Sequence, residues 1–240
     1  MKEITVATYN ILHGHDVGYD WSRIAEIVAA SGADIVGFQE VDMHTGRTGG
    51  RDTVSGLAEA TGMPHALFVP AMDYDGGQYG TAILSRFAIK SFLSGPLQAG
   101  VYEPRAFGCM TVTLDDGTPL CFLNTHLSYE SDTQRAIQFL QLSRWMDKHI
   151  PAGVPAILTG DFNTEDFSAF VPICSRGYAL VNNDAHTYKT FRTNPVAIDN
   201  IVYRHAFLTP VEQGMIDSSC SDHNLLWCRF ALACSDTEEE

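Results

Sequence analysis

The sequence has few basic residues for its length. Its 240 residues include 15 Lys and Arg against 29 Asp and Glu, so the formal net charge is −14 at pH 7 with histidine neutral. Proteins that bind nucleic acid without sequence preference use clustered Lys and Arg side chains, which release counterions from the phosphates. The sequence contains no such cluster, so extended nucleic acid is an unfavourable partner, although a local basic site remains open.

Long apolar runs and paired cysteines are also missing. No run approaches the roughly 18 apolar residues that span a bilayer, and Met1 is followed by an alternating strand rather than by the apolar region of a signal peptide. The 6 cysteines form no Cys-x-x-Cys pair, and several lie inside apolar runs, as Cys121 does. Buried, reduced thiols in a cytoplasmic protein are the simplest interpretation.

A succession of strand and helix patterns fills the chain. Residues 4–9 alternate as a strand does, 20–31 have an N-cap at Asp20 and the apolar spacing of a helix, and 34–40 form an apolar strand. Strand, helix, strand is the opening of an α/β layer. Further helices are predicted at 53–61 and 131–149, and further strands at 81–85, 109–114, 120–125, 156–160, 198–203 and 224–232.

One domain is the simplest organisation. The chain has no Pro/Ser-rich linker and no repeat, so we expect a single domain over residues 1–234, followed by a disordered acidic tail at 235–240. The two halves are loosely similar, and packing them sheet to sheet gives a layered α/β sandwich. The residues expected near one face of the longest helix are Ile137, Leu140, Arg144 and Trp145.

Polar residues gather at the ends of the predicted strands. Asn10 and Glu40 follow the first two strands, and His126 and Asp161 follow two later ones. The other members of this group are Asn163, Asp199, Asp222 and His223. Strand ends that meet at one edge of packed sheets form a crevice, so we expect these side chains to line one site. No serine or cysteine stands in a recognisable nucleophile elbow.

These residue types indicate a metal-dependent reaction. Hard oxygen ligands, such as those of Glu40, Asn10 and the aspartates, suit Mg²⁺ or Mn²⁺. Two histidines beside a carboxylate-held cation can donate protons or hydrogen bonds to a phosphate, while an aspartate orients a water. The group therefore predicts metal-assisted hydrolysis of a phosphate ester.

Seven short strings carry a resemblance to a known family. They are Thr8-Tyr9-Asn10-Ile11, Gln39-Glu40-Val41-Asp42, Tyr79-Gly80-Thr81-Ala82-Ile83-Leu84-Ser85-Arg86, Asn124-Thr125-His126-Leu127, Gly160-Asp161-Phe162-Asn163, Ile198-Asp199-Asn200-Ile201 and Ser221-Asp222-His223. In these strings and in their order the sequence resembles the endonuclease/exonuclease/phosphatase superfamily, and among its members the short bacterial ones. The resemblance covers nearly the whole chain. It implies a four-layer αββα sandwich of two packed mixed β-sheets flanked by helices, and a divalent-metal phosphoesterase.

The resemblance also implies roles for individual residues. Glu40 resembles the metal-binding glutamate, assisted by Asn10. Asp161 resembles the aspartate that orients or deprotonates the attacking water, with Asn163 beside it. His126 resembles the histidine that hydrogen-bonds the phosphate and stabilises developing charge.

Further likenesses concern the second histidine and the substrate. Asp222-His223 resembles a terminal pair in which the aspartate fixes the tautomer of the histidine, and Asp199 resembles the carboxylate that holds a catalytic histidine. Both histidines are assigned as catalytic, and which of them is the base stays open. Arg105, in a recurring family string, and Tyr79 are the candidate substrate-binding residues.

Departures from the family pattern narrow the range of expected substrates. Leu12 stands where the abasic-site endonucleases carry a carboxylate, and Thr164 stands where the inositol 5-phosphatases carry a basic residue. These differences disfavour abasic-site DNA and polyphosphoinositides as substrates. A small molecule or a lipid head group fits the acidic chain better. A metal-dependent endonuclease or exonuclease is the alternative, and a non-catalytic binding scaffold is a further one.

Overall fold

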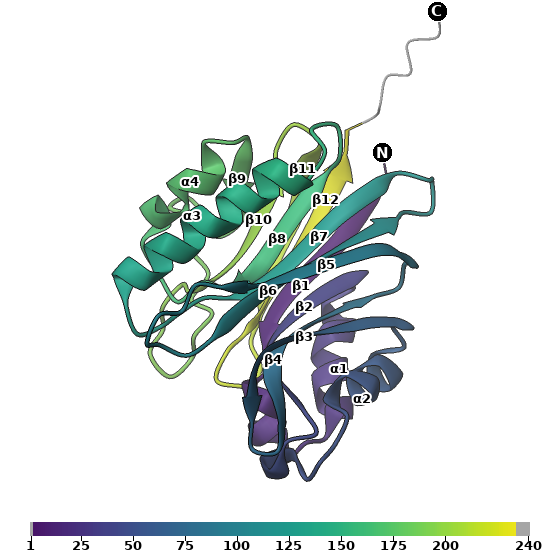
Figure 1. Ribbon diagram of the computed structural model, residues 1–240. Coiled ribbons are helices and arrows are strands. Elements are labelled where there is room, and N and C mark those ends of the chain that lie inside the picture. Colours follow the sequence, from purple (N-terminus) through teal and green to yellow (C-terminus); the bar gives the residue numbers. More distant parts are fainter. Residues whose placement is uncertain (1, 234–240) are drawn as a thin grey trace, which may run out of the picture.

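Apolar strands form two mixed six-stranded sheets that pack face to face, with helices on both outer surfaces (Figure 1). The computed structural model describes residues 2–233. In spatial order the first sheet contains β11 (Leu208–Ile216), β12 (Leu225–Leu232), β1 (Glu3–Asn10), β2 (Ile35–Met43), β4 (Gly77–Ser85) and β3 (His65–Tyr74). The second contains β5 (Ile89–Leu97), β6 (Arg105–Thr113), β7 (Pro119–His126), β8 (Ala156–Asp161), β10 (Asp199–Arg204) and β9 (Tyr178–Leu180). The expected αββα sandwich is confirmed.

The longer helices begin and end at their capping residues. α1 (Trp21–Ser31) follows Asp20, whose side chain accepts a hydrogen bond from the Ser22 backbone N–H, and it ends at Gly32 with a φ of 64°. α2 (Thr53–Thr61) ends at a glycine in the same left-handed conformation, and α3 (Asp132–His149) follows a capping serine. The short helices are α4 (Val171–Cys174), η1 (Leu12–Val17), η2 (Gly46–Thr48) and η3 (Phe167–Phe170).

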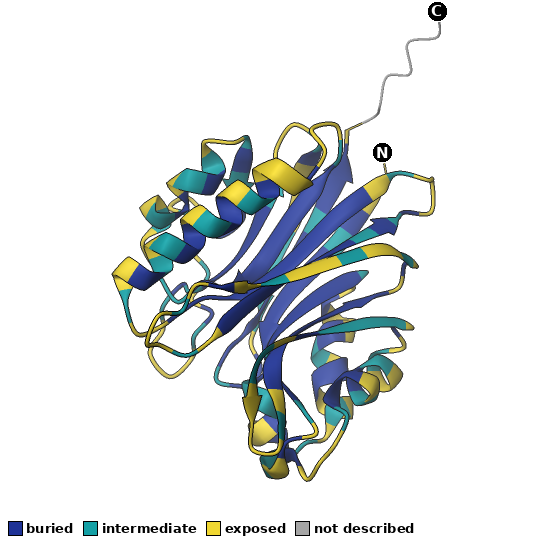
Figure 2. Ribbon diagram, viewed as in Figure 1, coloured by how far each residue is buried: buried dark blue, intermediate teal, exposed yellow. Residues whose placement is uncertain are grey.

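Three apolar clusters hold the four layers together. The cluster between the sheets includes Ile4 and Phe122, the cluster beneath α3 includes Phe139, and the cluster beneath α1 and α2 includes Ile24. Figure 2 shows buried central strands between helices whose outer surfaces are exposed. This packing fixes the strand ends, and the site described below stands on them.

Four strands lie where the sequence patterns predicted none: β3, β5, β9 and β11. All four are edge strands. Pro70 in β3 and Pro210 in β11 stand at register shifts of the ladder. A proline has no N–H to give to a neighbouring strand, so it is tolerated at an edge or a bulge and hides such strands from a pattern search.

The face of α3 expected to carry Ile137, Leu140, Arg144 and Trp145 is not the buried one. Phe139 and Leu142 are buried, whereas Leu140 is 44% exposed. The buried face also carries Gln138, which accepts a hydrogen bond from the Ser128 N–H and donates one to a backbone carbonyl. The apolar stripes of this helix lie side by side. The stripe that includes Gln138 is the buried one, and its burial lets this side chain pair with backbone groups of the adjacent loops.

Two expectations concern the chain as a whole. Within residues 2–233, no helix is both long enough and apolar enough to cross a membrane. The predicted acidic tail at 235–240 lies outside the described residues, and the single domain over 1–234 stays a prediction.

Candidate active site

Strand ends bring the predicted site residues to one edge of the sandwich. β1 is parallel to β2 and β7 to β8, so their C-terminal ends lie at a shared edge. Asn10 ends β1, His126 ends β7 and Asp161 ends β8. Asp199 begins the antiparallel β10 and is in register with Asp161.

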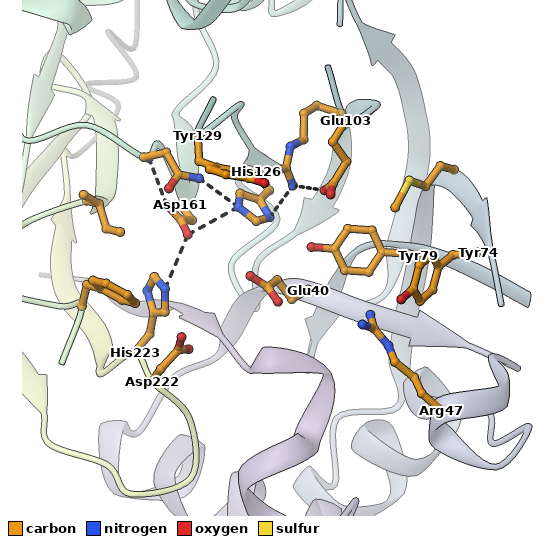
Figure 3. Close-up of a pocket in the computed structure, with 15 residues that line it drawn as sticks. Glu40, Arg47, Tyr74, Tyr79, Glu103, His126, Tyr129, Asp161, Asp222 and His223 are labelled. Atoms are coloured by element: carbon orange, nitrogen blue, oxygen red, sulfur yellow. Dashed lines mark hydrogen bonds and ion pairs between the residues drawn. The ribbon is translucent and has the colours of Figure 1, made fainter. Parts of the chain in front are cut away.

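A cavity of about 480 Å³ opens at this edge (Figure 3). Its lining residues are Glu40, Arg47, Met72, Tyr74, Tyr79, Glu103, Arg105, His126, Tyr129, Asp161, Asn163, Phe191, Ile198, Asp222 and His223. Eight of the predicted site residues are among them. The other two, Asn10 and Asp199, are buried and hydrogen-bond to residues that line the cavity.

Asp161 lies at the centre of the site and is only 2% exposed. Its Oδ2 lies 3.5 Å from His126 Nε2 and 3.7 Å from His223 Nε2. Dashed lines mark both contacts in Figure 3. The same oxygen accepts a hydrogen bond from Asn10 Nδ2 at 3.1 Å. Burial, and then the nearby carboxylate of Asp199, raise the pKa of Asp161. A carboxyl group with a raised pKa that faces a cavity is suited to accept a proton.

His223 is held by Asp199. Its Nδ1 lies 2.8 Å from Asp199 Oδ2 and must donate, because a carboxylate can only accept. Burial lowers the pKa of His223, but the charge and the hydrogen bond of Asp199 raise it by more, and the pKa is about 10. The expectation that Asp222 fixes this histidine is wrong, since Asp222 accepts from Ser221 Oγ at 3.3 Å and lines the cavity. The other aspartate that the resemblance assigned to a catalytic histidine, Asp199, is the one that bonds to the ring.

His126 has the opposite electrostatic environment. Its Nδ1 lies 3.0 Å from Arg105 Nη1, and its Nε2 lies 3.0 Å from Asn163 Nδ2. Arg105 can only donate, so His126 Nδ1 accepts its hydrogen bond, and the single proton of a neutral ring lies on Nε2, which is 3.5 Å from Asp161 Oδ2. A ring protonated at both nitrogens would lose the hydrogen bond from Arg105. Burial, and then the charge of Arg105, hold the pKa of His126 well below its usual range. The two histidines therefore differ in charge at neutral pH.

Glu40 reaches the cavity from a bulge in β2. The register of β2 with β4 shifts between Phe38 and Val41, and Glu40 has a φ of 55°. Its Oε1 accepts from Asn10 Nδ2 at 3.1 Å, while Asn10 Oδ1 accepts from the backbone of η1. Asn10 therefore ties two carboxylates together through its nitrogen, and its oxygen, with one hydrogen bond, keeps a second lone pair.

The charge of Glu40 fits a bound cation. Burial raises the pKa of Glu40, but contacts with His13, His126 and Asn10 lower it to about 2, so the group is ionised. No Lys or Arg of residues 2–233 pairs with it. An ionised, three-quarters-buried carboxylate without a cationic side chain is a hard ligand suited to Mg²⁺ or Mn²⁺.

A second group of donors lies beside the first. One ligand atom each from Asp161, Asp199 and His223 lie within 4.8 Å of one another, which makes this group a possible metal site. Two of its members bond to each other at 2.8 Å, whereas Asp199 Oδ1 is buried and has no hydrogen-bond partner among the described residues.

The outer part of the cavity was only partly found from the sequence. Arg47 donates two hydrogen bonds to Asp42, at 2.6 and 2.8 Å, and its guanidinium lies 4.5 Å from the ring centroid of Tyr74. Arg105 Nη1 lies 3.0 Å from Glu103 Oε1. Each guanidinium charge is thus balanced by a carboxylate. Tyr74 reaches the cavity from the end of β3, a strand that the sequence pattern did not predict.

Backbone strain is concentrated at the site. Seven non-glycine residues within 2–233 have a positive φ, and Leu12, His13, Glu40 and Asn163 are among them. Such conformations cost about 1 to 3 kcal/mol each and persist where the surrounding structure imposes them. Glu40 and Asn163 line the cavity, and Leu12 and His13 lie in the turn whose Leu12 N–H donates to Asn10 beside it, which points to a function for this place.

The sandwich and this site define a phosphoesterase-like architecture, and comparison with known families agrees. A model of the Endonuclease/Exonuclease/phosphatase family matches residues 7–223, so the chain belongs to this family. Members of the family are hydrolytic phosphoesterases that generally depend on divalent metals. No curated protein sequence matches the chain significantly.

Solved structures share the fold at low sequence identity. An endonuclease/exonuclease/phosphatase from Beutenbergia cavernae is 20% identical, with a TM-score of 0.79, over 97% of this chain and 72% of that one. The catalytic domain of human Nocturnin, with bound sulfate, is 21% identical, with a TM-score of 0.75, over 96% and 95% of the two chains. A mannosyl-6-phosphatase from Bacteroides thetaiotaomicron is 22% identical, with a TM-score of 0.69, over 96% and 100%.

Proposed function

We propose that this chain is a divalent-metal-dependent hydrolase of phosphate esters that uses direct attack by water. The observation that carries the proposal is the arrangement around Asp161. A buried carboxylate with a raised pKa lies 3.5 and 3.7 Å from two histidine nitrogens, beside the ionised Glu40. No Ser or Cys lines the cavity, so the nucleophile in this mechanism is water.

Glu40 would hold the cation, with its carboxylate oriented by Asn10. When bound, Mg²⁺ or Mn²⁺ supplies positive charge beside the phosphate and favours deprotonation of water. Asp161 orients the water and accepts its proton as the new P–O bond forms and the P–O bond to the alcohol breaks. The leaving oxygen is protonated from solvent.

The two histidines then have different tasks. His223, positively charged through Asp199, donates a hydrogen bond from Nε2 to a phosphate oxygen and stabilises the charge that develops there. His126 stays neutral, and Arg105 and Asn163 fix the orientation of its ring beside the phosphate. Asp222 contributes negative charge at the cavity wall.

Chelation tests the metal requirement. Excess EDTA should abolish hydrolysis of bis-p-nitrophenyl phosphate, and added Mg²⁺ or Mn²⁺ should restore it. Glu40→Gln should lose most of the restored activity, whereas Glu59→Gln, at an exposed position of α2, should keep it. Full activity in excess EDTA would contradict the proposal.

Small phosphorylated molecules or lipid head groups are the proposed substrates. Arg47 and Arg105 are each paired with a carboxylate, so neither offers an uncompensated charge to a second phosphate. The outer wall is formed by the rings of Tyr74, Tyr79 and Tyr129, which suit an uncharged ring or chain next to one phosphate. The structural relative that is a mannosyl-6-phosphatase makes sugar phosphates a natural part of a substrate panel.

A metal-dependent nuclease is the second candidate, because the superfamily includes nucleases and the cavity edge is open to solvent. Salt distinguishes the two candidates. Cleavage of an oligonucleotide should weaken steeply as salt rises, whereas turnover of a small phosphate ester should change little. A non-catalytic scaffold would instead show no turnover of any ester in a panel of sugar phosphates, lipid head groups and short oligonucleotides.

A further inference from the structure

His13 faces the oxygen of Glu40 that Asn10 does not bind. The distance from His13 Nδ1 to Glu40 Oε2 is 4.0 Å, and the His13 side chain is 14% exposed. Its Nδ1 is buried and has no hydrogen-bond partner among the described residues. A buried ring nitrogen without a partner is costly and calls for an explanation, such as an ion that is bound there.

The backbone before and after this ring is held in a rare conformation. Leu12 and His13 have φ values of 44° and 45°, and Gly14 has 79°. The Leu12 N–H donates to Asn10 Oδ1 at 3.1 Å, which ties the turn to the site. A Cβ on Gly14 would lie 2.3 Å from the ring of Trp21, so the turn is tightly packed on its other side. Strained left-handed turns of this kind occur where a side chain must be placed for function.

The separation of the two atoms matches a shared cation. Divalent metals bind nitrogen and carboxylate oxygen at roughly 2.1 Å, so two ligands on opposite sides of one ion lie about 4.2 Å apart. The observed 4.0 Å is close to this value, and it is too long for a direct hydrogen bond. A cation held by both atoms would account for this separation and for the unpartnered nitrogen of His13.

We infer that His13 Nδ1 and Glu40 Oε2 are both ligands of the catalytic cation, which makes the site a mixed nitrogen and oxygen site. This inference rests on the proposed metal-dependent function and specifies its ion. Imidazole raises the affinity for transition metals relative to Mg²⁺, which prefers oxygen alone. The chain should therefore bind Mn²⁺ more tightly than Mg²⁺.

Calorimetry on the metal-free full chain tests this assignment. His13→Ala should weaken Mn²⁺ binding by about 10-fold or more and Mg²⁺ binding by clearly less, which removes the preference for Mn²⁺. His13→Asn should behave in the same way, and it keeps a residue that tolerates the left-handed backbone. His15→Ala is the matched control, because His15 is exposed and pairs with Asp16.

Pulsed electron paramagnetic resonance of the Mn²⁺ complex gives a second readout. The wild-type complex should show coupling to an imidazole nitrogen, which His13→Ala removes and His15→Ala retains. Equal weakening of both metals with unchanged nitrogen coupling would show that His13 only positions Glu40, and it would overturn the assignment. Wild-type protein that binds neither metal would instead contradict the proposed function itself.

Discussion

The buried pair of Asp199 and His223 allows a quantitative test of the site's electrostatics. Asp199→Asn removes one negative charge 2.8 Å from His223 Nδ1 but keeps an oxygen that can accept the same hydrogen bond. His223 and Asp199 side chains are 4% and 1% exposed, so solvent screens the interaction weakly. The variant therefore isolates the contribution of the charge.

The expected magnitude follows from the pKa of His223. A change from the ordinary value of 6.5 to about 10 corresponds to roughly 5 kcal/mol in favour of the protonated ring. Asp199 is the main cause that raises the pKa, so without its charge the pKa of His223 should fall toward or below 6.5. Turnover should fall by about 10²- to 10⁴-fold at neutral pH, the range for loss of a correctly protonated catalytic group.

The sign of the pH dependence can be derived. Because the folded protein holds the proton of His223 more tightly than the unfolded chain does, the pair stabilises fully below pH 6.5, and this contribution is lost as the pH rises to about 10. In EDTA, the difference in unfolding free energy between wild type and Asp199→Asn should shrink over this range. Nitrogen NMR of the histidine rings measures the pKa directly. A wild-type His223 that titrates near 6.5 would refute the reasoning.

Two further predictions concern packing, and urea unfolding checks both. Leu142→Ala should cost about 2 to 5 kcal/mol because it opens a cavity beneath α3, whereas Leu140→Ala on the exposed side should change stability by less than about 0.5 kcal/mol. Gly37→Ala should destabilise by about 1 to 3 kcal/mol, since its Cβ would lie 2.3 Å from Thr159 Oγ1, and Gly153→Ala, with nothing within 4 Å, should be close to neutral. Equal effects within either pair would contradict the packing described.

The central elements of the fold could be predicted because their signals are local. The caps at Asp20 and Gly32 fix the ends of α1, and the Asp116-Gly117 turn lies between β6 and β7 as a hairpin requires. The edge strands could not be predicted in this way, since they are half exposed and contain prolines such as Pro96 in β5. Their place depends on the neighbouring strand rather than on their own pattern.

The site shows the same division. Its strand-end residues could be found because these polar side chains interrupt or follow apolar runs of the sequence, and in the structure most of them line one cavity. The partner of His223 does not follow from adjacency, because it is Asp199, 24 residues away, which only the family resemblance had assigned to a catalytic histidine. No sequence pattern indicated His13, because its side chain is placed by the left-handed backbone of Leu12 and His13, which no motif predicts.

The most direct test of the central claim is the turnover rate of Asp161→Asn with Mn²⁺ or Mg²⁺ present. It should be measured on the phosphate ester that the wild-type chain hydrolyses fastest, with the unfolding midpoint as a check on folding. We predict a rate at least about 100-fold below wild type, because the amide cannot accept the proton of the attacking water. A folded Asp161→Asn protein with wild-type turnover would contradict the assignment of this cavity as the place of hydrolysis.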